Sequence, residues 1–331
     1  MFPHVRYVTE PEPAPDPLGF ILDTLSHPGH VALLVAGGLA VLGLLAAWHR
    51  LRPMEDARLR LVARATSYRD LVPWMLRLSF GLVLLGAGLT RVLFAPDVRP
   101  PDWPYLVLSA LGFLLLLGLA VRPAALAALL VYLGGLVWQP GLIEIWDVAG
   151  GLAALALLGP GLPSLDDLLR HAFPRAPGRA AVTEGPTTGV YADLVPLLAR
   201  IGLGGAFVAS GIVDKFLSYP QGLEAVAKYG LTSLVPVAPE MWVVGAGVLE
   251  STLGLAILLG VMTRFSVVTG FAVLTLAVFG LPDDPILAHV GLFGLSSVLF
   301  VLGAGRWGVD AWLGRRFATS GTADPVDARG C

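Results

Sequence analysis

Cysteine and charge are both scarce in this chain of 331 residues. The single cysteine is Cys331, so the chain supplies neither a CxxC dithiol nor the ligands of an iron–sulfur cluster. Charged residues make up only 14% of the sequence, against about a quarter in a typical soluble domain. No P-loop, HExxH or GxSxG motif occurs in a suitable context. Any catalysis would therefore use carboxylate, lysine or histidine proton chemistry, or a partner's cofactor.

Apolar residues dominate instead, at 56% of the chain with a mean hydropathy of +0.76. A helix that crosses a bilayer needs about 20 apolar residues. The runs that approach this length are 28–48, 72–95, 104–121, 123–139, 143–161, 194–213, 240–261, 265–281 and 286–303. The sequence therefore predicts an all-α, polytopic membrane protein with about nine transmembrane helices. A lipid bilayer is its expected environment, and no nucleic-acid partner is expected.

The basic residues predict an orientation in the plasma membrane. Arginines follow the first apolar run closely, and basic loops stay in the cytoplasm. Threading the spans from an external N-terminus places 17 of the 22 basic residues on the inside. The C-terminus is then cytoplasmic. Only His289 of the six histidines falls within the repeated units of the membrane region, so no haem held by two membrane histidines, and no metal site, is expected.

Two stretches of the chain repeat each other. Residues 77–91 and 200–214 each begin with arginine and carry glycines four and eleven residues later. Residues 112–122 and 254–264 match in the same way, and a Gly-X-Gly turn follows the last apolar run of each unit. Matches in the same order and at similar spacing indicate an internal repeat. We therefore expect two tandem four-helix bundles after one N-terminal helix.

This organisation divides the chain into seven parts. They are a flexible extracytoplasmic tail (1–27), an N-terminal transmembrane helix (28–49), a cytoplasmic interfacial segment (50–71), the first four-helix unit (72–169), a cytoplasmic linker (170–193), the second four-helix unit (194–316) and a disordered tail (317–331).

Counting along the helices places several charged residues at one depth. Asp214 and Glu250 each lie fourteen residues from an arginine at the predicted inner end of their helix, and His289 lies fourteen residues before the inner end of its own. Fourteen residues of helix span roughly 21 Å. With Lys215, these side chains form one outer layer. A lone acid at such depth costs about 2.5–3.5 kcal/mol, so we expect Glu250 to contact Lys215 directly or through water.

The candidate site residues are accordingly Asp214, Lys215, Glu250 and His289. The Lys215–Glu250 pair is either a working site or a structural ion pair that sets helix register. His289, expected within reach of the same pocket, is either a proton carrier or a hydrogen-bonded residue between helices.

The first unit differs from the second in this layer. Leu108 stands at the position that matches Glu250, and Arg91 matches Asp214, while acids occur at Glu144 and Asp147 on the last helix. We expect Arg91 to meet one of these two acids, forming a first-unit charged layer. Four arginines are expected to act as structural anchors at the inner face: Arg77, Arg122, Arg200 and Arg264.

The second unit also carries a chain of motifs in a fixed order. Asp214-Lys215 is followed by Phe216, then by Ala-Lys-Tyr-Gly-Leu at 227–231, Glu250, and a Thr-Arg pair at 263–264. From residue 200 to 310 this order resembles the DoxX family of four-helix membrane proteins. The first unit resembles a degenerate copy.

The resemblance implies three classes of function. Some relatives, such as the DoxD subunit of thiosulfate:quinone oxidoreductase, belong to membrane redox complexes, and others are described with thiol or oxidative-stress partners. The first hypothesis is therefore a subunit of a quinone-linked or thiol/sulfur redox complex, with a quinone and a redox partner protein. The alternatives are a transporter or binding protein for a lipid or small molecule, and a purely structural subunit.

Overall fold

The computed structural model describes residues 15–51, 55–95, 98–99, 103–172, 193–281 and 285–319. Within these ranges every long element is a helix and no strand is formed. Before and within the first unit lie α1 (Pro17–Ser26), α2 (Pro28–Leu51), α3 (Glu55–Thr66), η1 (Arg69–Leu71), α4 (Val72–Leu89), α5 (Trp103–Leu117), α6 (Val121–Trp138), η2 (Pro140–Ile145), α7 (Trp146–Leu158) and α8 (Leu165–Ala172). The second unit holds α9 (Leu194–Ala209), η3 (Ser210–Leu217), α10 (Tyr219–Lys228), η4 (Leu231–Ser233), α11 (Pro239–Leu259), α12 (Thr263–Gly280), α13 (Ile286–Leu302) and α14 (Val309–Thr319).

Helix length and composition agree with a polytopic membrane protein. In the described part of the chain, six helices are long and apolar enough to cross a bilayer, or seven if the bent pair α1 and α2 counts as one span. Two further apolar helices, α5 and α13, have 15 and 17 residues and are shorter than that. The expected count of nine spans is therefore not confirmed.

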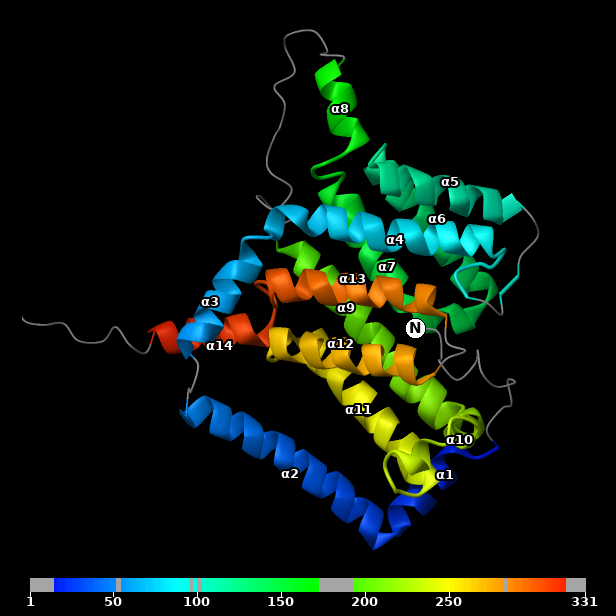
Figure 1. Cartoon of the computed structure of the whole chain (residues 1–331), viewed down its shortest axis with the longest axis vertical. Coiled ribbons are helices and arrows are strands. Elements are labelled where there is room, and N and C mark those ends of the chain that lie inside the picture. The colour runs from blue at the N-terminus through cyan, green and yellow to red at the C-terminus, as the bar shows by residue number, and fades with distance from the viewer. Residues whose placement is uncertain are drawn as a thin grey trace, which may run out of the picture.

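The helices of the two units interlock (Figure 1). Within the units, α4 packs on α5 as α9 packs on α11, and α6 packs on α7 as α12 packs on α13. Between the units, α7 packs on α9 while α13 packs on α4. The last helix of each unit thus packs against the first helix of the other. Reciprocal packing of this kind is what a pseudo-two-fold axis between the units would produce.

The same close contacts recur in both units. A methyl group added at Gly88 would lie 2.7 Å from the carbonyl oxygen of Tyr105, and one added at Gly211 would lie 2.7 Å from that of Gly247. These positions correspond in the repeat. In both places only the absence of a side chain lets two helix backbones touch.

Two of the predicted anchors are buried and bind carbonyl groups at helix ends. Arg77 donates to the carbonyls of Leu115, Leu116, Pro160 and Pro163 at 2.7–3.1 Å. Two of these carbonyls belong to the last turn of α5 and two to the turn between α7 and α8. They tie three segments of the first unit together.

The equivalent position in the second unit acts in the same way. Arg200 donates to the carbonyl of Ala304 at 3.0 Å, and Arg264 donates to the carbonyl of Phe300 at 2.9 Å. Arg122 is exposed and lies beside Gly159.

The expectation of a flexible tail over residues 1–27 is wrong for its last third. Asp16 caps the N-terminus of α1 by accepting a hydrogen bond from the Gly19 amide, and Pro17 occupies the first helical position. Both are strong helix-start signals. The apolar side of α1 then packs on η3 and α11, and Phe20 stacks on Tyr219 with ring centroids 4.0 Å apart.

Helices lie within two of the other predicted segments. The N-terminal helix is present as α2, which runs along the outside of the units in Figure 1. The interfacial segment contains α3. Residues 173–192 of the predicted linker and residues 320–331 of the predicted tail lie outside the described residues.

Candidate functional site

A widened helical turn carries the first half of the site. At Ser210 the α-helical pattern of α9 gives way to the π-helix η3, which runs to Leu217. π-helical turns are rare and occur frequently at functional sites. Three polar residues of this turn are buried: Ser210, Asp214 and Lys215. The wider turn lets the adjacent Asp214 and Lys215 both face the interior.

The second half comes from α11, which approaches η3 through glycines. A methyl group at Gly247 would lie 3.0 Å from the Cβ atom of Lys215, so the backbone of α11 runs directly beside the lysine stem. Gly211 faces the same backbone from η3. Glu250 follows Gly247 by three residues and therefore lies on the same face of α11. This places its carboxylate against the lysine.

Four side chains form the buried charged cluster: Ser210, Asp214, Lys215 and Glu250. The Nζ atom of Lys215 lies 3.2 Å from Oε2 of Glu250 and 3.7 Å from Oδ2 of Asp214. The Ser210 hydroxyl lies 2.7 Å from Oε2 of Glu250 and 3.0 Å from Oδ2 of Asp214, and it accepts a hydrogen bond from Lys215 at 3.3 Å. The predicted contact between Lys215 and Glu250 is thus direct and is confirmed.

The hydrogen bonds within the cluster leave one acceptor oxygen without a donor. A serine hydroxyl carries one proton, so Ser210 donates to Asp214 or to Glu250 but not to both at once. The other oxygen of Asp214, Oδ1, is buried and has no hydrogen-bond partner among the described residues. With all groups ionised the cluster carries one net negative charge, and one added proton makes it neutral.

The remaining predicted site residue, His289, lies on a different helix, α13. It is buried near the start of α13, where its ring nitrogen Nδ1 lies 3.2 Å from the carbonyl of Pro285. Its ring packs near Phe293. Pro285 is the residue that precedes α13, and Phe293 lies within α13, so a pocket shared with Lys215 and Glu250 stays a prediction.

The prediction that Arg91 belongs to a charged layer of the first unit does not agree with the structure. The helix α4 ends at Leu89, and Arg91 follows in a left-handed conformation with φ of 55° and an exposed side chain. Glu144 and Asp147 are buried instead. The chain thus leaves the helix two residues before Arg91, whose exposed side chain differs from the two buried acids.

The structure places Glu144 near the second unit. Its element, η2, packs on α9, and Glu144 lies within electrostatic range of Asp214. An acid predicted to serve the first unit therefore borders the cluster of the second.

Sequence reasoning missed Ser210. It lies four residues before Asp214 and five before Lys215, a spacing that reaches the lysine only in a π-helical turn. A buried serine in a glycine-rich helix is ordinarily a packing residue, so its type alone gave no signal. Among the described residues, no group of three or more His, Cys, Asp and Glu is placed to hold a metal ion.

One region of the chain matches a known protein family. Residues 195–283 match the model of the DoxX family, so the DoxX resemblance of the second unit is confirmed. The match spans α9 to α12 and includes every member of the buried charged cluster; the first unit and His289 lie outside it. Neither the curated proteins nor the solved structures gave a match.

Proposed function

We propose that this multi-pass membrane protein, built around a DoxX domain, takes up and releases a proton at the buried charged cluster, as a subunit of a quinone-linked or thiol/sulfur redox complex. One observation carries the proposal. Two buried carboxylates, Asp214 and Glu250, share a single ammonium group and a single hydroxyl. Ionisable residues inside a membrane are expensive to keep and mark proton or substrate sites by default.

Each member has a distinct part in the proposal. Glu250 and Asp214 are the alternative proton acceptors. Lys215 lies between them, and its ammonium group balances part of their negative charge. Ser210 contacts both carboxylates, so rotation of its hydroxyl switches the hydrogen bond from one to the other.

The first unit argues against a purely structural role for the cluster. Its equivalent positions hold Val92 and Leu108, both buried, in place of Lys215 and Glu250. Yet α4 and α5 approach each other as closely there, through Gly88, as the matching helices do in the second unit. The helix crossing therefore forms without an ion pair. Apolar residues in place of a buried pair are often neutral or stabilising, so retention of the charges favours a function.

The redox setting rests on the DoxX match, since a DoxX-like subunit implies a membrane redox complex in the relatives considered above. The cluster supplies groups for proton binding and none that changes oxidation state. Electrons would accordingly pass between a quinone and a redox partner protein, while this chain handles the accompanying proton.

A second candidate function is the binding of a lipid or small molecule. A specific observation favours it, namely an apolar cavity in the first unit. That cavity is remote in sequence from the cluster.

Infrared difference spectroscopy of the purified protein tests proton binding directly. A pH titration should show a protonated carboxyl band that is lost or shifted in Glu250→Gln and Asp214→Asn. The matched control is Glu240→Gln, which removes an exposed carboxyl from the same helix. If the folded Glu250→Gln and Asp214→Asn proteins keep the band unchanged, the cluster does not bind the proton.

The redox part needs a separate readout. In the isolated complex, Glu250→Gln should abolish quinone-dependent turnover while the subunit still assembles. Full turnover by an assembled Glu250→Gln complex would remove the redox role and leave proton binding to be judged on the infrared result.

We further propose that the protein lies in the plasma membrane with its N-terminus outside and its C-terminus in the cytoplasm. The distribution of 17 of 22 basic residues supports this orientation. In a Cys331→Ser background, a cysteine introduced at position 183 should resist a membrane-impermeant thiol reagent in intact cells. Labelling of that cysteine from outside would reverse the orientation.

A further inference from the structure

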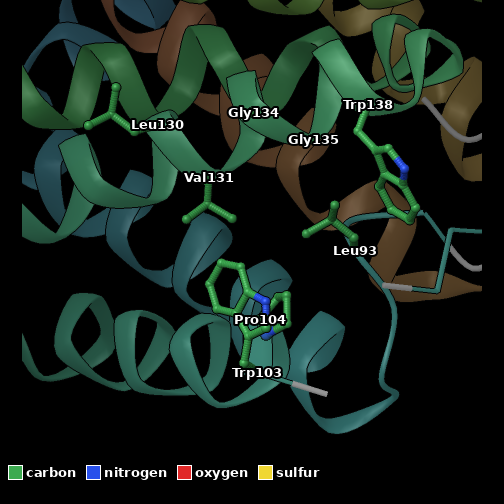
Figure 2. Close-up of a pocket in the computed structure, with 8 residues that line it drawn as sticks. All are labelled: Leu93, Trp103, Pro104, Leu130, Val131, Gly134, Gly135 and Trp138. Atoms are coloured by element: carbon green, nitrogen blue, oxygen red, sulfur yellow. The ribbon is translucent and has the colours of Figure 1, made fainter. Parts of the chain in front are cut away.

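An apolar cavity of about 480 Å³ lies between α5 and α6 in the first unit. Its size falls within the range of about 300–1,000 Å³ that small-molecule sites occupy. Figure 2 shows Trp103 and Pro104 on one side, Leu130, Val131 and Trp138 on the other, and Leu93 at the loop that closes one end. The lining contains no charged residue.

The cavity faces the surroundings of the protein rather than its core. Trp103 is 64% exposed and Trp138 is 52% exposed, at the start of α5 and the end of α6. Tryptophans of this kind gather where the hydrocarbon layer meets the headgroups. Between the tryptophans, a side chain added at Gly134 would meet nothing within 4 Å. The wall is therefore open at the position where a ligand chain would lie.

Two exposed arginines flank the closed end. Arg91 precedes the cavity residue Leu93 by two positions, and the amide of Leu93 donates to the carbonyl of Val98 at 2.7 Å. This bond brings the next residue, Arg99, alongside. Neither arginine forms an ion pair with a residue in the described part of the chain. The cavity thus has an apolar interior and two positive charges at one end.

We propose that this cavity binds one acyl chain of an anionic phospholipid, whose phosphate lies between Arg91 and Arg99. An apolar channel takes the chain, and the paired arginines match a negative headgroup. The proposal stands independently of the proton function of the cluster, which lies in the other unit.

The residues that line the cavity are replaced by others at the equivalent positions of the second unit. Through the repeat, Leu276 stands where the first unit has Gly134, and glycines 245 and 280 stand where it has Trp103 and Trp138. Leu276 is 73% exposed, and the two ring walls are missing. Lipid binding is accordingly expected in the first unit alone.

Native mass spectrometry of the delipidated protein tests the proposal. The probes are phosphatidylglycerol, phosphatidylcholine and ubiquinone at equal concentration. One phosphatidylglycerol should bind preferentially. The Arg91→Gln/Arg99→Gln variant should bind it about 25-fold more weakly, at about 1 kcal/mol for each arginine near the headgroups. Gly134→Leu should abolish its retention by filling the cavity.

The controls use matched changes elsewhere. Gly37→Leu adds the same side chain to the exposed face of α2, where a methyl group would also meet nothing within 4 Å. Arg315→Gln/Arg316→Gln removes two exposed arginines from α14. Both should bind phosphatidylglycerol as the unaltered protein does. Equal binding of phosphatidylcholine, displacement of phosphatidylglycerol by ubiquinone, or normal binding by Gly134→Leu would each overturn the proposal.

Discussion

Removal of Lys215 should destabilise the protein more than removal of Glu250. In Lys215→Met, two buried carboxylates lose their shared cation and keep only the hydroxyl of Ser210. Leaving a buried charge without its partner typically costs about 3–5 kcal/mol. In Glu250→Gln the lysine keeps Asp214 at 3.7 Å, so the loss is nearer to one charged hydrogen bond, about 1.5–3 kcal/mol.

The double variant measures the interaction between Lys215 and Glu250 apart from the other effects of each substitution. Lys215→Met/Glu250→Gln leaves Asp214 with Ser210, a single acid that already has a hydrogen-bond partner. It should therefore be more stable than the sum of the two single losses predicts, by a coupling free energy of about 0.5–3 kcal/mol.

Thermal unfolding of the detergent-purified protein provides the assay, with Glu240→Gln as the surface control. All four variants are measured in the same detergent and at the same pH. Equal losses in the two single variants, or a double variant that simply adds them, would show that the cluster does not act as one electrostatic unit.

Two further predictions concern the scaffold. Gly211→Ala should destabilise the protein by about 1–3 kcal/mol, because the new methyl group would press on the carbonyl of Gly247; in thermal unfolding, Gly134→Ala should show no loss, since that site is open. Arg77→Lys should cost about 1–3 kcal/mol, because an ammonium group cannot reproduce the four guanidinium bonds to carbonyl oxygens. An unchanged melting temperature for either Gly211→Ala or Arg77→Lys would contradict the packing described for that helix end.

The helical fold followed from the sequence because burial in lipid demands long apolar runs. What composition could not supply is the exact length of each helix. The helix α4 was expected to reach residue 95, yet it ends at Leu89, and α5 has only 15 residues. Helix ends depend on local turns and on bonds from distant residues, such as those of Arg77, which a hydropathy pattern does not contain.

Part of the site was also predictable. Counting along two helices from arginines at the same end placed Lys215 and Glu250 at one depth, because the rise per residue of a helix is nearly constant. The π-helical turn was not predictable, since it depends on how η3 packs against α11. Ser210 was missed for that reason, and Arg91 was misplaced because depth counting assumed a helix that the chain had already left.

The matching contacts of the two units support the view that the first is a second copy of the DoxX-like bundle. The contacts that hold each bundle are made by glycine backbones and by arginines bound to carbonyl groups. The residues near the cluster end differ between the units although these contacts recur in both. At that end the second unit has Lys215 and Glu250, whereas the first has Val92, Leu108 and an apolar cavity. On this view, the proposed duplication places the proposed proton site in one half of the scaffold and the proposed lipid site in the other.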